Sequence, residues 1–151
     1  MEIEVKSEEE LKIFGARFGA LLSGGEVIEL VGDVGAGKTT FVKGVAVGMG
    51  IDEDVQSPSF TINRLYEAVG SIQLSHYDFY RLQDPGIMSV ELQESLNDSK
   101  VVTIIEWAEI VNGVLPVDRV TIRLSSPTET SRHLSISSGG EKSHAVLEAL
   151  R

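Results

Sequence analysis

A glycine-rich segment, GDVGAGKT at residues 32–39, constrains this chain more than any other part of its sequence. It matches the pattern G-x-x-x-x-G-K-[ST] in full. A mostly apolar stretch at 26–31 precedes it, which predicts a short strand, and residues 39–49 follow with the apolar spacing of a helix. Because the pattern lies between a strand and a helix, the context favours a phosphate-binding loop over a chance match.

The residues of this segment are suited to holding the phosphates of a nucleotide. Glycines let the backbone fold tightly with its N–H groups pointing inward, and the following helix adds the positive end of its dipole. Lys38 is predicted to contact the β- and γ-phosphates, and the Thr39 hydroxyl to ligate Mg²⁺. The alternative is a glycine-rich turn without a ligand. The nucleotide-binding residues predicted from this segment are Gly32, Asp33, Val34, Gly35, Ala36, Gly37, Lys38, Thr39 and Thr40.

Strand-like and helix-like segments alternate along the whole chain. Ser7 and Glu10 form a capping pattern that opens the first helix. Strands are predicted at 2–5, 26–31, 60–67, 71–78, 101–105, 117–125 and 132–137, and further helices at 39–49, 88–96, 107–115 and 141–151. This order predicts an α/β fold: a P-loop NTPase-type three-layer sandwich with a parallel central sheet and antiparallel hairpins at its edges. Residues 1–151 are expected to form a single P-loop ATPase domain.

Charge and composition exclude several classes of function. The chain has 13 Lys and Arg against 23 Asp and Glu, a formal net charge of −10. Since phosphate backbones are bound largely through Lys and Arg, direct tight binding of nucleic acid by this chain alone is not expected. No apolar run approaches the roughly 20 residues that cross a bilayer. The acidic N-terminus does not resemble a signal peptide. We therefore expect a cytoplasmic protein without a membrane partner.

Two acidic residues are candidates for the catalytic site. Glu106 follows the apolar run VVTII and is predicted to contact the metal, because the carboxyl end of a central strand faces the ligand crevice. The alternative is a carboxylate that caps the helix beginning nearby, a role that the same residue could share. Asp78 ends another predicted strand and could orient the attacking water or complete the metal shell, or could simply begin a loop. His76 lies two residues earlier on the same strand face and is interpreted as structural.

Four further residues could act near the nucleotide. Thr61 or Ser59, in the segment SPSFT, could sense the γ-phosphate as in nucleotide switches, although Ser and Thr beside proline commonly serve only the turn. Trp107, the only tryptophan, could pack near the nucleotide or fill space. Arg81 could stabilise transition-state charge or form a surface ion pair. Because no clear arginine finger is present, slow intrinsic turnover is expected.

Four segments together resemble the TsaE (YjeE) family, the ATPase component of the bacterial machinery that makes threonylcarbamoyladenosine in tRNA. They are GDVGAGKTTFVKG at 32–44, SPSFT at 57–61, HYDFYRL at 76–82 and IEWAE at 105–109. The resemblance spans nearly the whole chain. Ser59 departs from the more usual threonine, and Gly86 stands where the family tends to have an acidic residue, which leaves the length of the helix there in question.

The resemblance implies roles for residues at matching positions. The lysine and threonine of the loop would bind phosphate and Mg²⁺, and Thr61 would belong to a switch-like loop. Asp78 would be important for hydrolysis, Glu106 would contact the metal, and Trp107 would support activity. The family also implies weak ATPase activity alone and action with the TsaB–TsaD complex, where ATP hydrolysis would permit repeated rounds of threonylcarbamoyl transfer. The transfer itself would belong to TsaD.

Two other functions remain open at this point. A small-molecule kinase could use the same scaffold, although the chain lacks an Arg-rich lid and an acceptor-binding insert. A nucleotide-dependent binding switch with negligible catalysis is also compatible with the loop. The chain has no N-K-x-D segment of the kind that reads guanine, so ATP is the expected nucleotide.

Overall fold

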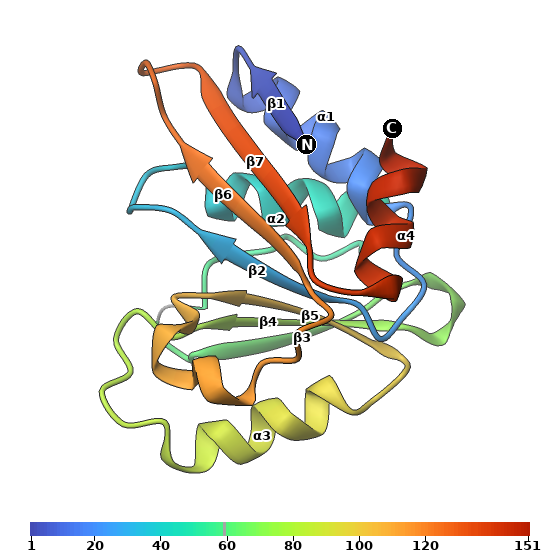
Figure 1. Ribbon diagram of the computed structural model, residues 1–151, viewed down its shortest axis with the longest axis vertical. Coiled ribbons are helices and arrows are strands. Elements are labelled where there is room, and N and C mark those ends of the chain that lie inside the picture. Colours follow the sequence, from blue (N-terminus) through green and yellow to red (C-terminus); the bar gives the residue numbers. More distant parts are fainter. Residues whose placement is uncertain (59) are drawn as a thin grey trace.

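Seven strands form one mixed sheet in the computed structural model, which describes residues 1–58 and 60–151 (Figure 1). The strand order is β1-β7-β6-β2-β5-β4-β3. Their bounds are β1 Glu2–Val5, β2 Val27–Val31, β3 Asn63–Glu67, β4 Gln73–Asp78, β5 Val101–Glu106, β6 Val120–Ser125 and β7 Arg132–Ser138.

The centre of the sheet is parallel and its edges are antiparallel. β6, β2, β5 and β4 run parallel to one another, as expected for buried strands rich in Val, Ile and Leu. β3 pairs antiparallel with β4 at one edge, and β7 pairs antiparallel with β6 and β1 at the other. The predicted α/β class, the parallel centre and the two antiparallel hairpins are therefore confirmed, but only the β3–β4 hairpin forms an edge, because β1 lies outside the β6–β7 hairpin.

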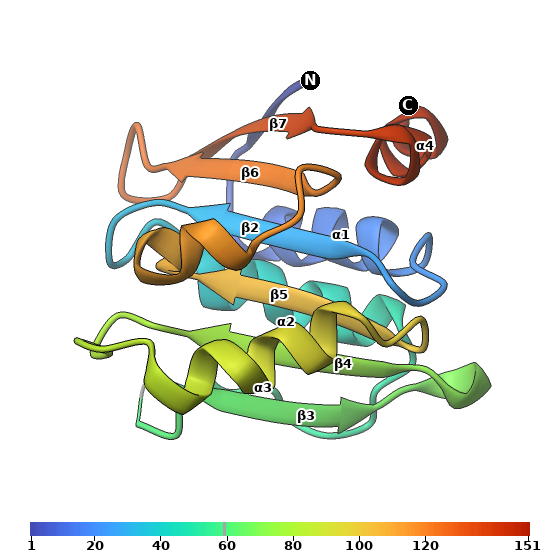
Figure 2. The same ribbon diagram turned by 60° about the horizontal axis from the view of Figure 1, so that its bottom comes forward.

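Helices cover both faces of the sheet (Figure 2). α1 and α2 lie on one face, whereas α3 and the 3₁₀ segment η2 lie on the other. The helices are α1 Glu8–Gly19, α2 Lys38–Gly48, α3 Gly86–Leu96 and α4 Glu141–Leu150, with 3₁₀ segments η1 Val69–Ser71 and η2 Ala108–Val114. In the part of the chain that the structure describes, no helix is long and apolar enough to cross a membrane.

Strand alternation decides which side chains of β4 and β5 face α2. Leu74 and Ile104 belong to the core beneath α1 and α2. Because side chains alternate between faces, Asp78 and Glu106 share this face, while Tyr77 packs in the opposite core with α3. The two acids thus end adjacent parallel strands on the side of the sheet that carries the loop helix.

Helices α1 and α2 approach each other closely through small residues. A side chain on any of four glycines would collide with backbone of the other helix: Gly15 and Gly19 on α1, and Gly44 and Gly48 on α2. The phenylalanines of α1, Phe14 and Phe18, pack on Phe41 of α2 with ring centroids 6.2 and 5.6 Å apart. This contact fixes the position of α2, whose N-terminus begins at Lys38.

Asp118 caps α4 from outside the helix. Gly140, at the N-cap position, has no side chain, and the Asp118 carboxylate instead accepts hydrogen bonds from the backbone N–H groups of Lys142 and Ser143, at 3.0 and 2.9 Å. The Ser143 hydroxyl also donates to it, at 2.6 Å. The Ser143 hydrogen bonds hold the pKa of Asp118 below its ordinary value.

Asp118→Ala is expected to lower the free energy of unfolding by about 1 kcal/mol at neutral pH, as for other lost helix caps. Since the folded-state pKa is depressed, the stabilisation is full above the unfolded-state pKa and disappears as pH falls through the folded-state value. Urea unfolding at pH 7 and at successively lower pH measures the difference. A difference that stays constant into strong acid would contradict this assignment.

The structure differs from the predicted boundaries at several points. β6 begins at Val120 rather than at 117. β3 begins at Asn63 rather than at 60 because Ile62 has a left-handed φ of 70°, and β4 begins after Ser71, whose φ is 63°. The segment predicted as a helix at 107–115 is a 3₁₀ segment with a kink at Val111. α3 begins at Gly86 itself, so the departure from the family pattern there does not shorten the helix.

Candidate functional site

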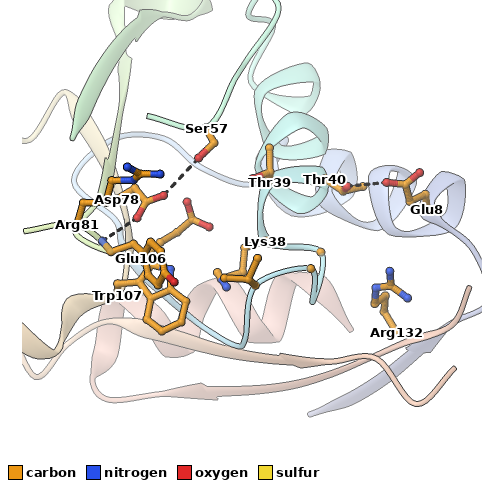
Figure 3. A pocket seen from close by; sticks show the side chains of 14 residues that line it. Glu8, Lys38, Thr39, Thr40, Ser57, Asp78, Arg81, Glu106, Trp107 and Arg132 are labelled. Atoms are coloured by element: carbon orange, nitrogen blue, oxygen red, sulfur yellow. Dashed lines mark hydrogen bonds between the residues drawn. The ribbon is translucent and has the colours of Figure 1, made fainter. Parts of the chain in front are cut away.

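A cleft of about 330 Å³ lies at the carboxyl ends of β2, β5 and β4, which are neighbours in the sheet (Figure 3). In an open parallel sheet this is the place where ligands bind. Its walls come from the loop before α2, the ends of β4 and β5, and the first residues of α1 and β7. The lining residues are Glu8, Val34, Gly35, Gly37, Lys38, Thr39, Thr40, Ser57, Asp78, Tyr80, Arg81, Glu106, Trp107 and Arg132.

The loop places Lys38 at the centre of this cleft. Gly35 and Gly37 have φ angles of 84° and 107°, in the left-handed region that glycine adopts without strain. The Lys38 ammonium donates hydrogen bonds to two carbonyls of its own loop, those of Gly32 and Asp33. A phosphate oxygen could take the place of either carbonyl.

Burial lowers the pKa of Lys38 from its ordinary value of 10.5, while the charges of Glu106 and Asp78 oppose that shift. Only 7% of the residue is exposed. The ammonium also lies 4.7 Å from the centre of the Trp107 ring. The cleft therefore holds a desolvated cation that lacks any carboxylate within salt-bridge distance among the described residues.

Trp107 turns the chain directly after β5. It has a left-handed backbone, with φ 58° and ψ 51°, and its ring packs on Tyr80 with centroids 4.9 Å apart. A non-glycine residue in this conformation is strained, and such strain is found preferentially at functional sites. Here the turn lets Glu106 face α2 while the next side chain extends over Lys38.

Glu106 and Asp78 lie directly opposite each other in the pairing of β5 with β4. Glu106 is 2% exposed and its Oε2 lies 2.9 Å from Nε2 of His76, which is completely buried. Among the described residues no side chain caps the start of η2, and the Glu106 carboxylate bonds to His76 instead, so the capping role considered for Glu106 is wrong. His76 shares the strand face of Asp78, as predicted, and contacts the predicted metal residue.

Asp78 contacts the loop that precedes β3. Its Oδ2 accepts a hydrogen bond from the Ser57 hydroxyl at 3.3 Å, and its Oδ1 accepts one from the backbone N–H of Tyr80 at 3.0 Å. The backbone N–H of Asp78 donates to the carbonyl of Ile62 at 2.8 Å. Asp78 therefore links the end of β4 to the segment around residues 57–62.

The opposite end of the cleft is formed by Thr40, Glu8 and Arg132. The Thr40 hydroxyl donates to Oε1 of Glu8 at 3.1 Å. Nη1 of Arg132 is held by backbone carbonyls of the β6–β7 turn, while its Nε is buried without a hydrogen-bond partner among residues 1–58 and 60–151. Figure 3 shows Lys38 between this end and the end that carries Asp78, Glu106 and Trp107.

Most of the predicted site residues line the cleft, and a few do not. Gly32 and Asp33 line a smaller cavity of about 150 Å³ beside it, which Trp107 also borders. Ala36 is buried in the core. Thr61 is exposed and does not line the cleft, so its switch role stays a prediction. Ser59 lies outside the described residues.

Arg81 lies 4.7 Å from the ring centre of Phe60, a cation–π contact at the border of the cleft. No ion pair of Arg81 is present among the residues that the structure describes. Stabilisation of transition-state charge by Arg81 stays a prediction.

No group of three or more acidic or histidine side chains that could hold a metal ion by themselves occurs in the described ranges. Mg²⁺ is usually held by one or two carboxylates together with the phosphates of a nucleotide, and does not need such a group. Thr39 and Glu106, the predicted metal residues, both line the cleft.

Sequence reasoning missed Glu8, Ser57, Tyr80 and Arg132 as lining residues. Glu8 belongs to the first turn of α1 and Arg132 begins β7, nearly the full chain apart. No motif marks them, because only the packing of α1 on α2 and of β7 beside β6 brings them to the cleft. Tyr80 and Ser57 lie within the family-like segments and could have been found there.

Comparison with known proteins identifies the family. The sequence model of the family described as "Threonylcarbamoyl adenosine biosynthesis protein TsaE" matches residues 5–134, which include every residue that lines the cleft. This chain belongs to the TsaE family. Proteins of the TsaE family are involved in the biosynthesis of threonylcarbamoyladenosine in tRNA.

Relatives of the TsaE family match nearly the full length of the chain. The tRNA threonylcarbamoyladenosine biosynthesis protein TsaE of Bacillus subtilis is 35% identical over 142 residues, covering 94% of this chain and 88% of the relative. The protein of the same name from Treponema pallidum is 37% identical over 132 residues, covering 87% and 96%. The crystal structure of Bacillus subtilis YdiB superposes with a TM-score of 0.81 at 31% identity, covering 99% of this chain and 93% of that one.

Proposed function

We propose that this chain is a Mg²⁺-dependent ATPase subunit of tRNA threonylcarbamoyladenosine biosynthesis, with weak activity of its own. The observation that carries the proposal is the convergence of Lys38 with Asp78 and Glu106 in one cleft, at the carboxyl ends of adjacent parallel strands. Cation, metal-contacting acid and water-positioning acid are the parts that phosphoryl transfer needs. We assign the fold to the P-loop NTPase-type three-layer sandwich and residues 1–151 to a single P-loop ATPase domain.

The two ends of the cleft carry different residues, and this difference indicates the direction in which ATP would lie. The γ-phosphate would face the end with Asp78 and Glu106, and the nucleoside would extend past Thr40 toward Glu8 and Arg132. Backbone N–H groups of the loop and the N-terminus of α2 would hold the phosphates between these ends. ATP is preferred over GTP because the sequence has no N-K-x-D segment.

Five residues of the cleft have a defined task in this proposal. Lys38 leaves the carbonyls of its own loop and donates to the β- and γ-phosphates. Thr39 and Glu106 would hold Mg²⁺, whose charge neutralises the phosphate oxygens when bound. Asp78 would orient the attacking water, and Trp107 would shield the Lys38 ammonium from solvent. Thr61 is proposed to approach the γ-phosphate when the segment around it responds to nucleotide.

The proposal includes the partners of the chain. We propose that it acts in the cytoplasm with TsaB and TsaD, and that hydrolysis permits repeated rounds of threonylcarbamoyl transfer by TsaD. With a net charge of −10, the chain would contact these proteins rather than bind tRNA tightly itself.

A reconstituted modification reaction tests the pathway role. With TsaB, TsaD, substrate tRNA and the threonylcarbamoyl donor present, addition of the chain and Mg²⁺-ATP is expected to raise the modified tRNA formed per TsaD molecule above one. Product that stays at or below one per TsaD, with the chain fully folded, would count against the proposal.

A nucleotide-dependent binding switch is the second candidate, since Asp78 contacts Ser57, which belongs to the loop before β3. Asp78→Asn separates the two functions because asparagine keeps the shape of the side chain. If Asp78 orients water, the variant should bind ATP normally and lose partner-stimulated hydrolysis by about 100-fold or more, as for other groups that assist proton transfer. Phosphate release and ATP affinity measure the two quantities. Unchanged hydrolysis would favour the switch.

A further inference from the structure

A histidine and a glutamate lie side by side beneath the cleft, both buried. Nε2 of His76 is 2.9 Å from Oε2 of Glu106, and the two residues are 0% and 2% exposed. They come from adjacent parallel strands: His76 pairs with Ile104, one side-chain layer below the pairing of Asp78 with Glu106. His76 therefore supports Glu106 from the side away from the cleft.

The fold alone does not call for a polar pair at this position. Below the two acids that end the strands, this face of β4 and β5 is apolar apart from His76, with Leu74, Val102 and Ile104 in the core beneath α2. Replacing a buried ion pair by well-packed apolar residues is often neutral or stabilising. Apolar residues at these positions would fit that layer, so the stability of the sheet does not explain why the chain has His76.

The imidazole of His76 makes a hydrogen bond through only one of its two ring nitrogens among the described residues. Nδ1 is buried and has no hydrogen-bond partner among the described residues. Buried polar atoms normally have partners, and an exception calls for an explanation. Because a carboxylate oxygen only accepts, Nε2 must carry the hydrogen of the bond to Glu106. Among the described residues, Glu106 is thus the only hydrogen-bond partner of the His76 side chain.

We propose that His76 is a positioning residue for Glu106. By donating from Nε2 to Oε2, it fixes the carboxylate so that Oε1 is presented to the cleft, where Mg²⁺ would be held together with the nucleotide. This inference rests on the proposed function of the site. Partners that orient a metal-contacting side chain commonly change metal affinity or activity by about 10- to 100-fold when removed.

This arrangement also separates the tasks of the two adjacent acids. Asp78 is held by Ser57 and by the backbone of Tyr80, so its orientation follows the loop around residue 57. Glu106 is held by His76 of the adjacent strand, and this contact does not involve that loop. We therefore expect the orientation of Glu106 to be independent of the loop around residue 57, whereas Asp78, the acid proposed to position water, can respond to that loop.

Two amide variants test the geometry of the contact. In His76→Gln the amide nitrogen can occupy the place of Nε2, whereas in His76→Asn it reaches only the place of Nδ1. Trp107, the single tryptophan, lines the cleft and reports nucleotide binding by its fluorescence without hydrolysis. Mg²⁺ is titrated into each variant with ATP, and ATP is also titrated in EDTA.

His76→Asn is expected to raise the half-saturating Mg²⁺ concentration about tenfold, and His76→Gln to keep it within about twofold of the wild type. The affinity for ATP in EDTA should be the same in the wild type and both variants. A variant that had lost its structure would bind ATP more weakly in EDTA as well. Wild-type Mg²⁺ dependence in His76→Asn would overturn this inference alone. A wild-type protein without any Mg²⁺-dependent ATP signal would overturn the proposed function as well.

A second measurement on the wild type needs no variant to fold. ¹⁵N NMR of the imidazole distinguishes a ring nitrogen that carries hydrogen from one that does not. The proposal requires hydrogen on Nε2 of His76, slowly exchanging because the residue is fully buried. An Nε2 without hydrogen would overturn it.

Discussion

Lys38→Met is expected to weaken ATP binding by about 100-fold or more and to abolish measurable hydrolysis, while the protein stays folded. The loss follows from removing two charge-assisted hydrogen bonds to the phosphates, each of which is worth about 1.5–3 kcal/mol. Fluorescence of Trp107 and phosphate release measure the two effects. Lys43→Met, the same change on α2 at a residue that does not line the cleft, serves as the control and should leave both unchanged.

Lys38→Met should not lower the stability of the fold. A loss of ATP binding in a variant of unchanged stability would then not be due to a general structural defect. Burial lowers the pKa of Lys38, so the folded state disfavours its charge. That penalty is full below the folded-state pKa and is relieved as pH rises through it, because the unfolded chain binds more protons between that value and 10.5. The melting temperature of Lys38→Met should therefore equal or exceed that of the wild type at neutral pH. A variant that melts well below the wild type would contradict this account of the site.

Gly48→Ala is expected to destabilise the fold by at least about 3 kcal/mol, at the upper end for overpacked cores. A Cβ at this position would collide with the carbonyl oxygen of Ala16 and the backbone nitrogen of Ala20 on α1. Backbone cannot rotate away as a side chain can, so α1 and α2 must separate. Thermal unfolding should show a melting temperature about 6–12 °C lower, given the usual 2–4 °C per kcal/mol at this size.

Gly113→Ala is the matched control for Gly48→Ala. Gly113 lies in η2, and a Cβ there would meet nothing within 4 Å. The same methyl group should therefore leave the melting temperature nearly unchanged. If both variants melt alike, the close contact of α1 with α2 does not limit stability, and the account of how the fold holds the loop helix would fail.

Much of the fold follows from local patterns in the sequence. The Ser7 side chain accepts a hydrogen bond from the Glu10 backbone at 3.1 Å and opens α1, as the capping pattern predicts. The apolar run at 101–105 lies in β5, a fully buried strand of the parallel centre. Such signals depend on neighbours in sequence, and this is why they could be predicted. The turns at Ile62 and Ser71 could not, because neither residue type signals a left-handed backbone.

The site was predictable in its motif residues and not in its tertiary contacts. Lys38, Asp78 and Glu106 follow from a loop pattern and from strand ends that a parallel sheet brings together. The hydrogen bond between His76 and Glu106 forms because β4 and β5 are neighbours in the sheet and because their register places His76 one side-chain layer before Glu106. The sequence of either strand alone predicts neither the neighbour nor the register. The position of Arg132 depends in the same way on the pairing of β7 with β6.

Phosphate release from Mg²⁺-ATP, measured with and without the TsaB–TsaD pair and repeated with GTP, tests the central claim most directly. We expect slow hydrolysis by the chain alone, a clear increase when the pair is added, a preference for ATP, and loss of the signal in EDTA. Hydrolysis that neither requires Mg²⁺ nor responds to the pair would contradict the account.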